Sequence, residues 1–287
     1  MPDRTLSDRP DRTVSVSTAP YDGHPFEAVL ESLAACGADH VEPAYIVGYT
    51  EPFDESAFTA AETERHRQLI AASGLGCRAV SSHIDLGNPD AVEVFSGRMR
   101  FARGIGADII LTNAAVVAKA APLERNLEAL LRFAEELGLV IALENPGDGR
   151  DNLMNTAAEG LALVSRFDTP HLRLNYDAAN TCSHRPDVDP AEDAVLSLPG
   201  CGHMHLKDVR RTDQGWFFAP IGDGDIDFGK IFAGLRAHPG LPVSLELPLR
   251  LHRGPDAQPI RRPEPLPIGE IEAAITRSLQ VIGAALA

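Results

Sequence analysis

Short apolar segments alternate with amphipathic segments along the chain from residue 13 onward. The apolar segments are seven to ten residues long and are bounded mostly by Gly, Pro, Asn or Asp, which is typical of buried strands. Between them, apolar residues recur at intervals of three and four, as in helices that cover a sheet. The pattern predicts eight strands, over residues 13–21, 40–46, 77–86, 107–114, 139–146, 172–180, 201–208 and 242–248.

Three of the amphipathic segments show the helical spacing most clearly. Residues 125–138 repeat leucines three and four apart, and Gly138 stands where a helix would end. Residues 88–102 open with an Asn-Pro pair that favours a helix start. Residues 268–287 carry a stripe of Ile and Leu to the end of the sequence. We therefore expect a helix after most of the strands.

This alternation predicts the fold class. Eight strand–helix units in 287 residues, with no linker or low-complexity segment, indicate a single (β/α)₈ TIM barrel over residues 13–287, preceded by a polar leader of residues 1–12. A doubly wound open α/β sheet is the alternative. That fold would need a glycine-rich phosphate-binding loop after a strand, and the sequence has none.

Two longer stretches without a regular pattern follow the seventh and eighth predicted strands, at residues 210–225 and 250–265. We predict irregular loops there, on the side of the barrel where such enzymes build their active sites. The IGDGDIDF segment at the end of the first stretch is predicted to be a turn into the next helix, capped by Asp225 or Asp227.

Composition narrows the classes of partner. Lysine and arginine number 26 against 41 acidic residues, and the resulting charge of −15 repels nucleic acids and anionic lipid surfaces. No run is long enough to span a membrane, and the N-terminal residues contain no apolar signal segment. The four cysteines are widely separated and form no CxxC pair, so we expect neither a disulfide framework nor a thiolate zinc site. These features favour a cytoplasmic protein.

The last four predicted strands each carry an ionisable residue near the carboxyl end. In each strand, this residue alternates with leucine or another apolar residue. Side chains of a strand point alternately to its two faces, so the leucines of these strands face the helices and the intervening polar residues face the barrel interior. Four side chains are thereby directed inward at one mouth of the barrel: Glu144, Asp177, His205 and Glu246.

Three carboxylates at one mouth repel one another unless a positive charge lies between them. A divalent cation supplies that charge, and three carboxylates with one neutral imidazole suit Mn²⁺, Mg²⁺, Co²⁺ or Zn²⁺, of which we expect Mn²⁺ first. A single carboxylate at a strand end is more often a helix cap or part of a surface ion pair. Four ionisable residues at corresponding positions of successive strands instead predict a site for one metal ion.

The segments ALEN, NYDAAN, GHMHLKD, IGDGDIDF and SLELP resemble the xylose isomerase-like barrel family, which includes sugar and sugar-phosphate isomerases and epimerases, inosose dehydratases and endonuclease IV. The resemblance follows the strand order over nearly the whole chain and is most specific in the second half, where the HxHLKD subgroup acts on varied oxidised sugars. It implies one ion held by Glu144, Asp177, His205 and Glu246, with the two glutamates as proton-transferring groups. Ketose epimerases of this family carry a substrate-binding His three residues after the Asp, where this chain has Asn180.

Further polar and aromatic residues at strand ends or in the following loops are candidates for substrate contacts. Each also has a structural alternative, such as a core hydrogen bond for His83, an ion pair for Lys207 or a solvated surface position for residues of the loops. Glu42, at the end of the second strand, could equally face the substrate or the core. The candidates for substrate binding are His83, Asn113, Asn180, His203, Lys207, Arg211 and Trp216.

The chemistry that this set implies is proton abstraction beside a carbonyl. A divalent ion acidifies the C–H bond and stabilises the enediolate, while Glu144 and Glu246 move the proton. We expect a metal-dependent isomerase or epimerase of a ketose or oxidised sugar. A lyase that uses the same enediolate for decarboxylation, dehydration or cleavage of a 3-oxo-glycoside is the alternative.

Other classes of function fit the sequence less well. Endonuclease IV needs a cluster of metal ions with more His ligands and a basic face, against which the charge of −15 argues. A sugar-binding protein without activity would be favoured by loss of any of the four ligands, and all four are present. We therefore expect a sugar or sugar acid as the partner and no nucleic acid or membrane. Barrels of this family are often dimers or tetramers, but no residue run identifies an interface.

Overall fold

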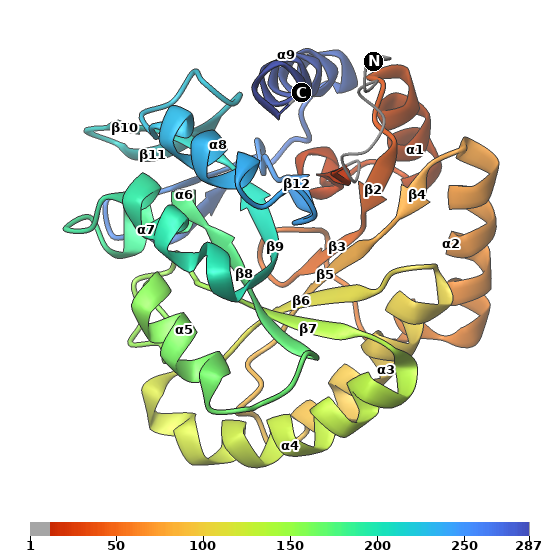
Figure 1. The fold of residues 1–287 in the computed structure, drawn as a ribbon. Coiled ribbons are helices and arrows are strands. Elements are labelled where there is room, and N and C mark those ends of the chain that lie inside the picture. Colours follow the sequence, from red (N-terminus) through yellow and green to blue (C-terminus); the bar gives the residue numbers. More distant parts are fainter. Residues whose placement is uncertain (1–11, 287) are drawn as a thin grey trace, which may run out of the picture.

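Ten parallel strands form one curled sheet in the computed structural model, which describes residues 12–286 (Figure 1). Their order in the sheet is β3-β5-β6-β7-β8-β9-β12-β1-β2-β4. The strands are β1 (Val14–Ser17), β2 (His40–Glu42), β3 (Ala44–Ile46), β4 (Gly76–Cys77), β5 (Ala79–His83), β6 (Ile109–Asn113), β7 (Val140–Glu144), β8 (Leu172–Asp177), β9 (Cys201–Leu206) and β12 (Val243–Leu245).

Two of the eight predicted strands are interrupted. Pro43, which has no amide hydrogen to donate, separates β2 from β3, and Arg78 separates β4 from β5. Because β2 pairs with β4 and β3 pairs with β5, the interrupted strands still join and the ring closes. The prediction of a single (β/α)₈ barrel is confirmed. Of the predicted polar leader, only Arg12 falls within the described residues; residues 1–11 lie outside them.

Helices surround the barrel, as Figure 1 shows. Helix α4 buries Leu123, Leu127, Leu130 and Ala134 and ends at Gly138, whose left-handed backbone (φ 64°) closes the helix as the sequence predicts. Within residues 12–286, no helix is long and apolar enough to cross a membrane. The helices are α1 (Phe26–Ala35), α2 (Ala60–Ser73), α3 (Ala91–Gly104), α4 (Ala120–Leu137), α5 (Ala157–Ser165), α6 (Ala178–His184), α7 (Pro190–Ser197), α8 (Phe228–Arg236) and α9 (Ile268–Leu286), with short 3₁₀ turns η1 (Ala19–Tyr21), η2 (Glu55–Phe58), η3 (Val117–Lys119) and η4 (Leu198–Gly200).

The barrel interior changes from apolar to polar along its axis. A small apolar cluster of four side chains from β5, β6 and β7 lies apart from the main core, which fills the space between strands and helices. Toward the carboxyl ends of the strands, the buried side chains become serines, asparagines, histidines and carboxylates. Buried polar side chains are informative because each must be hydrogen-bonded, paired or matched by a ligand. The apolar cluster consists of Ala79, Ile109, Leu111 and Ala142.

The two stretches predicted as irregular loops instead form a second sheet, so that prediction is wrong. This antiparallel sheet contains β10 (Asp208–Thr212), β11 (Gly215–Ala219), β13 (Leu251–Arg253) and β14 (Pro259–Arg261). The pairing of β11 with β13 joins segments that follow different barrel strands, and no local periodicity reveals such a long-range contact. We call this element the small sheet.

The IGDGDIDF turn wraps around the carboxylate of Asp208, which is fully buried. Gly224 is required there, because a Cβ atom would lie 2.1 Å from Asp208 Oδ1. Asp227 caps α8 as predicted, whereas Asp225 accepts a hydrogen bond from the backbone of β10 instead. The amides that donate to Asp208, at 2.8–3.3 Å, are those of Val209, Gly222, Gly224 and Ile226.

Replacing Asp208 by alanine should therefore destabilise the barrel. The change leaves four amides without their acceptor, and we expect the free energy of unfolding to fall by about 3 kcal/mol or more, as measured by urea denaturation. Asp213→Ala, at an exposed position of the β10–β11 turn, should change it by less than about 0.5 kcal/mol. Equal stability of the two variants would contradict this role of Asp208.

Candidate active site

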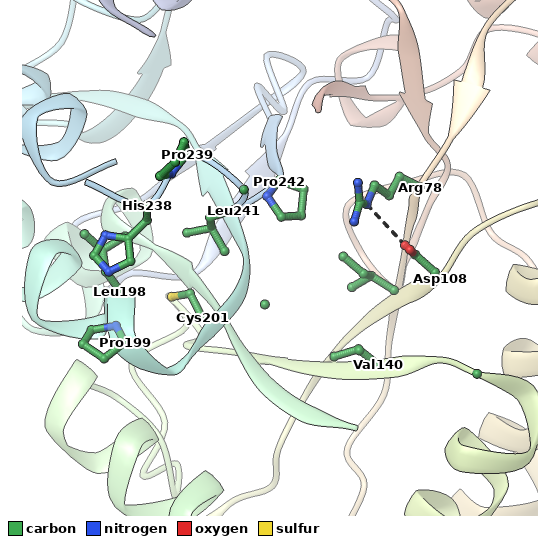
Figure 2. A pocket seen from close by; sticks show the side chains of 14 residues that line it. Arg78, Asp108, Val140, Leu198, Pro199, Cys201, His238, Pro239, Leu241 and Pro242 are labelled. Carbon is green, nitrogen blue, oxygen red and sulfur yellow. Dashed lines mark ion pairs between the residues drawn. The ribbon is translucent and has the colours of Figure 1, made fainter. Parts of the chain in front are cut away.

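Two of the cavities lie at opposite ends of the barrel. The larger, about 660 Å³, is at the amino ends of the strands, and Figure 2 shows the ion pair between Arg78 and Asp108 in its wall among proline and leucine side chains. The smaller, about 410 Å³, is at the carboxyl ends and includes Glu144 and Glu246 in its lining. Barrel enzymes carry out their chemistry at the carboxyl ends of the strands, so the smaller cavity is the candidate active site despite its size.

The four predicted metal ligands gather at this cavity. One donor atom from each of Glu144, Asp177, His205 and Glu246 lies within 4.8 Å of the others, and every one of these residues is at most 3% exposed. The Nδ1 atom of His205 faces the carboxylates, 3.3 Å from Glu144 Oε2, 3.5 Å from Glu246 Oε2 and 3.9 Å from Asp177 Oδ2. The structure therefore brings together side chains from four barrel strands or their ends.

Strand register explains why these side chains meet. Asp177 pairs with His205 across β8 and β9, and His205 pairs with Ser244 across β9 and β12. A register shift after Leu174 sets Asn175 opposite His203, so alternate residues of the two strands share the interior face. Sequence parity predicted these directions correctly.

Glu42 orients the imidazole of His205. Its Oε1 lies 3.0 Å from His205 Nε2 and accepts a second hydrogen bond from Ser81 at 2.8 Å. Burial would raise the pKa of Glu42, but His205 and His203 lower it to about 2, so the carboxylate is ionised. With Nε2 held by Glu42, the Nδ1 atom is left to face the carboxylate cluster. Glu42 thus supports the imidazole of His205. The sequence had left open whether this side chain faces the substrate or the core.

Lys207 forms an ion pair with two of the predicted ligands. Its Nζ atom lies 2.5 Å from Asp177 Oδ2 and 2.6 Å from Glu246 Oε2, and the side chain is 2% exposed. Burial opposes the charged form, but Asp177 and Glu246 raise the pKa of Lys207. The ion pair that was the structural alternative for Lys207 is thus present in the structure. Lys207 also lines the cavity.

Three other substrate candidates line the same cavity. His83 Nε2 lies 3.3 Å from Glu144 Oε2, and Asn180 donates a hydrogen bond to Glu144 Oε1 at 2.9 Å. Asn113 is the neighbour of Glu144 across β6 and β7. These side chains surround Glu144 and leave polar groups at the cavity wall, as expected for a site that binds hydroxyl groups.

The remaining three candidates do not line the cavity. His203 is fully buried beneath it, where Nδ1 bonds to Asn175 Oδ1 at 2.9 Å and burial lowers the histidine pKa to about 4. Arg211 and Trp216 are paired neighbours in the small sheet, with the exposed guanidinium 5.7 Å from the indole ring. The folding of their segment into a hairpin keeps these two side chains away from the cluster.

The cavity lining includes further residues beside the main candidates. Among them are Tyr49, which follows β3, and Arg253, which ends β13 in the small sheet and falls in the stretch after the eighth predicted strand. Both lie outside the barrel strands, so the parity that located the four ligands gave no signal for them.

The donor set fits a divalent cation. Asp177 Oδ2 is buried and accepts no well-directed hydrogen bond, even though Lys207 Nζ lies 2.5 Å away. Burial raises the pKa of Asp177, Lys207 opposes this, and Glu144 and Glu246 add to it. Burial would lower the pKa of His205, but surrounding carboxylates raise it well above its usual value. The cluster thus holds an excess of negative charge that a divalent ion would balance.

The comparisons with known proteins agree with this architecture. Residues 30–264 match the family described as xylose isomerase-like TIM barrel. The chain belongs to this family. The predicted resemblance to xylose isomerase-like barrels is therefore confirmed.

Individual relatives are more distant. An L-ribulose 3-epimerase of Mesorhizobium japonicum is 28% identical over 185 residues, which are 64% of this chain and 52% of the relative, so the match spans about half of that protein. A solved L-ribulose 3-epimerase superposes with a TM-score of 0.70 at 19% identity, covering 96% of this chain and 94% of the other. A 3-keto-D-glucoside 4-epimerase from E. coli superposes with a TM-score of 0.70 at 17% identity, covering 96% and 100%. Among the solved structures, the likeness shows a shared fold.

In this xylose isomerase-like barrel, the contact between Glu42 and His205 predicts a measurable effect on metal binding. Glu42→Gln keeps the shape of the side chain but removes the charge that orients the imidazole, so we expect affinity for Mn²⁺ to fall about 10- to 100-fold in a calorimetric titration of metal-free protein. Glu64→Gln, at an exposed position of α2, is the matched control and should bind as the unaltered protein does. Equal affinity of both variants would refute the orienting role of Glu42.

Proposed function

We propose that this protein is a divalent-metal-dependent sugar isomerase or epimerase that acts on a ketose or an oxidised sugar. The main support for this proposal is the position of the four clustered side chains relative to the cavity. Glu144 and Glu246 line the cavity, whereas Asp177 and His205 lie behind its wall. Two carboxylates thus adjoin the space where a substrate would lie. The similarity to an L-ribulose 3-epimerase supports this reading.

Glu144, Asp177, His205 and Glu246 would hold the ion, with Mn²⁺ favoured over Mg²⁺, Co²⁺ and Zn²⁺. When bound, a divalent ion supplies positive charge that acidifies the C–H bond beside a carbonyl and stabilises the enediolate that follows. The proton itself must be moved by side chains of the protein.

Glu144 is suited to accept that proton. Asn175 donates to its Oε2 at 2.7 Å and Asn180 to its Oε1 at 2.9 Å, so both oxygens are held in place. Burial opposes ionisation, but His205 and His83 lower the pKa of Glu144 well below its usual value. A fixed, ionised carboxylate at a cavity wall is the arrangement expected of a general base.

Glu246 would act on the same substrate from another direction. It follows β12, and β8 and β9 separate that strand from β7 in the ring. Lys207 holds one of its oxygens at 2.6 Å. Removal of the proton by one glutamate and its return by the other gives epimerisation, whereas return on the original face to the neighbouring carbon gives isomerisation.

The remaining polar wall would bind the sugar hydroxyls. His83, Asn113 and Asn180 lie around Glu144 at the cavity and offer both donors and acceptors. The cavity volume of about 410 Å³ is within the range of sites for small molecules. A lyase would use the same two carboxylates, so analysis of the products decides between the two outcomes.

The reaction can be followed as deuterium uptake. We expect manganese-loaded protein in D₂O to incorporate deuterium beside the carbonyl of L-ribulose, D-psicose or a 3-keto-glucoside, with all carbons retained. Glu144→Gln and Glu246→Gln should each slow this exchange about 10²- to 10⁴-fold, because each removes a proton-transferring group. EDTA should abolish it.

The controls separate the alternatives. The exposed Glu64→Gln variant should exchange at the unaltered rate. Release of CO₂ or loss of a substituent would identify a lyase, and sugar binding without any exchange would favour a binding protein. Full activity in rigorously metal-free protein would rule out the proposed chemistry.

A further inference from the structure

One cation in the cavity wall has no role in the proposed proton transfer. Arg253 is 4% exposed and lines the same cavity as the two glutamates. Among residues 12–286, no carboxylate oxygen pairs with it within 4.0 Å. The other two cations of the lining are both paired: Lys207 with Asp177 and Glu246, and Arg150 with Asp148 at 2.5 Å.

The hydrogen bonds of Arg253 leave one edge of the guanidinium poorly satisfied. Nη1 donates to the carbonyl of Ala257 at 3.1 Å, whereas Nη2 donates to Asn180 Oδ1 at a long 3.4 Å. Nε is buried and has no acceptor. Nε and Nη2 form the side edge of the guanidinium, which matches the two oxygens of a carboxylate. A buried donor without an acceptor is costly unless a ligand supplies one.

Neighbouring residues keep the guanidinium in this position. A Cβ atom on Gly147 would lie 2.8 Å from Cζ and Nη2 and 2.9 Å from Nε, so only glycine leaves room against the face of the guanidinium. Ala257, whose carbonyl holds Nη1, is the one non-glycine residue in the described chain with a left-handed backbone (φ 64°), a conformation that costs about 1–2 kcal/mol. Trp216 is the strand neighbour of Arg253 across β11 and β13, and its indole is buried.

The contacts of Arg253 include an aromatic ring but no anion. Its Cζ atom lies 5.3 Å from the centroid of the Tyr49 ring, which itself lines the cavity. Because no carboxylate of the described residues pairs with this guanidinium, an anionic group of a ligand would provide its ion-pair partner.

We infer that Arg253 binds a carboxylate group of the substrate and that the protein acts on a keto sugar acid in preference to a neutral ketose. This inference rests on the proposed function, since it assigns the substrate class of the same site. A single guanidinium edge supplies two donors and one positive charge, which match the two oxygens and single charge of a carboxylate, whereas a phosphate group carries a third oxygen and further charge.

D-Fructuronate and D-fructose test the inference, because they differ only in a carboxylate or a hydroxymethyl group at one end. We expect manganese-loaded protein to bind D-fructuronate at least tenfold more tightly than D-fructose in calorimetric titrations. Arg253→Met should reduce this preference about 10- to 100-fold, because charge-assisted hydrogen bonds are lost. Gly147→Ala retains the arginine but places a methyl group against the face of the guanidinium, which must then move, and should also reduce the preference.

The control is Arg262→Met, which removes an exposed arginine just beyond β14 and should leave the preference unchanged. Manganese stoichiometry and circular dichroism verify that each variant is folded and loaded. Equal binding of the two sugars by the unaltered protein, no binding of D-fructuronate, or an unchanged preference in a folded Arg253→Met variant overturns the inference. The comparison in the unaltered protein decides the matter even where a variant fails to fold.

Failure of the proposed function gives a different result. If neither sugar exchanges deuterium but D-fructuronate still binds through Arg253, the reaction is wrong and the assignment of a carboxylate ligand stands. If D-psicose exchanges rapidly and D-fructuronate does not bind, the reaction stands and the inference about Arg253 fails.

Discussion

The concentration of buried negative charge at the carboxyl end of the barrel is the constraint on which the rest of the site depends. Four carboxylates, those of Glu42, Glu144, Asp177 and Glu246, surround His205 where almost no solvent reaches. Such groups repel one another strongly at low dielectric and persist only if cations or donors balance them. The Lys207 ammonium, the asparagine amides and the proton on His205 supply part of this balance, and a divalent ion would supply the remainder.

The barrel supplies the rigid frame that holds these charges together. Parallel strands bring the ends of β7, β8, β9 and β12 side by side, and the apolar cluster below them leaves the polar layer only one open direction, toward the cavity. The small sheet then adds Arg253 to the cavity wall from outside the barrel. In the proposed function, the proton-transferring groups would stand on the barrel strands and the group that selects the substrate on an added element, which fits the way that barrel enzymes diversify.

The sequence predicted those features of the fold and the site that follow from the local alternation of apolar and polar residues. Each of the eight predicted strands begins within two residues of its predicted start, and parity alone directed Glu144, Asp177, His205 and Glu246 to the same mouth. It could not predict contacts between distant segments. Glu42 meets His205 across 163 positions of sequence, and the pairing of β11 with β13 turned two expected loops into a sheet. That pairing removed Arg211 and Trp216 from the cavity and brought in Arg253, for which a place in the stretch after the eighth strand was only a weak signal.

The central claim, that the four-residue cluster holds one divalent ion, is tested most directly by crystals grown with Mn²⁺ and measured for anomalous scattering. We expect one peak per chain, about 2.0–2.3 Å from oxygens of Glu144, Asp177 and Glu246 and from Nδ1 of His205, with Glu42 still on Nε2. A cluster without a peak, with Lys207 still bridging Asp177 and Glu246, would contradict it, as would an ion bound instead between Glu42, His203 and His205.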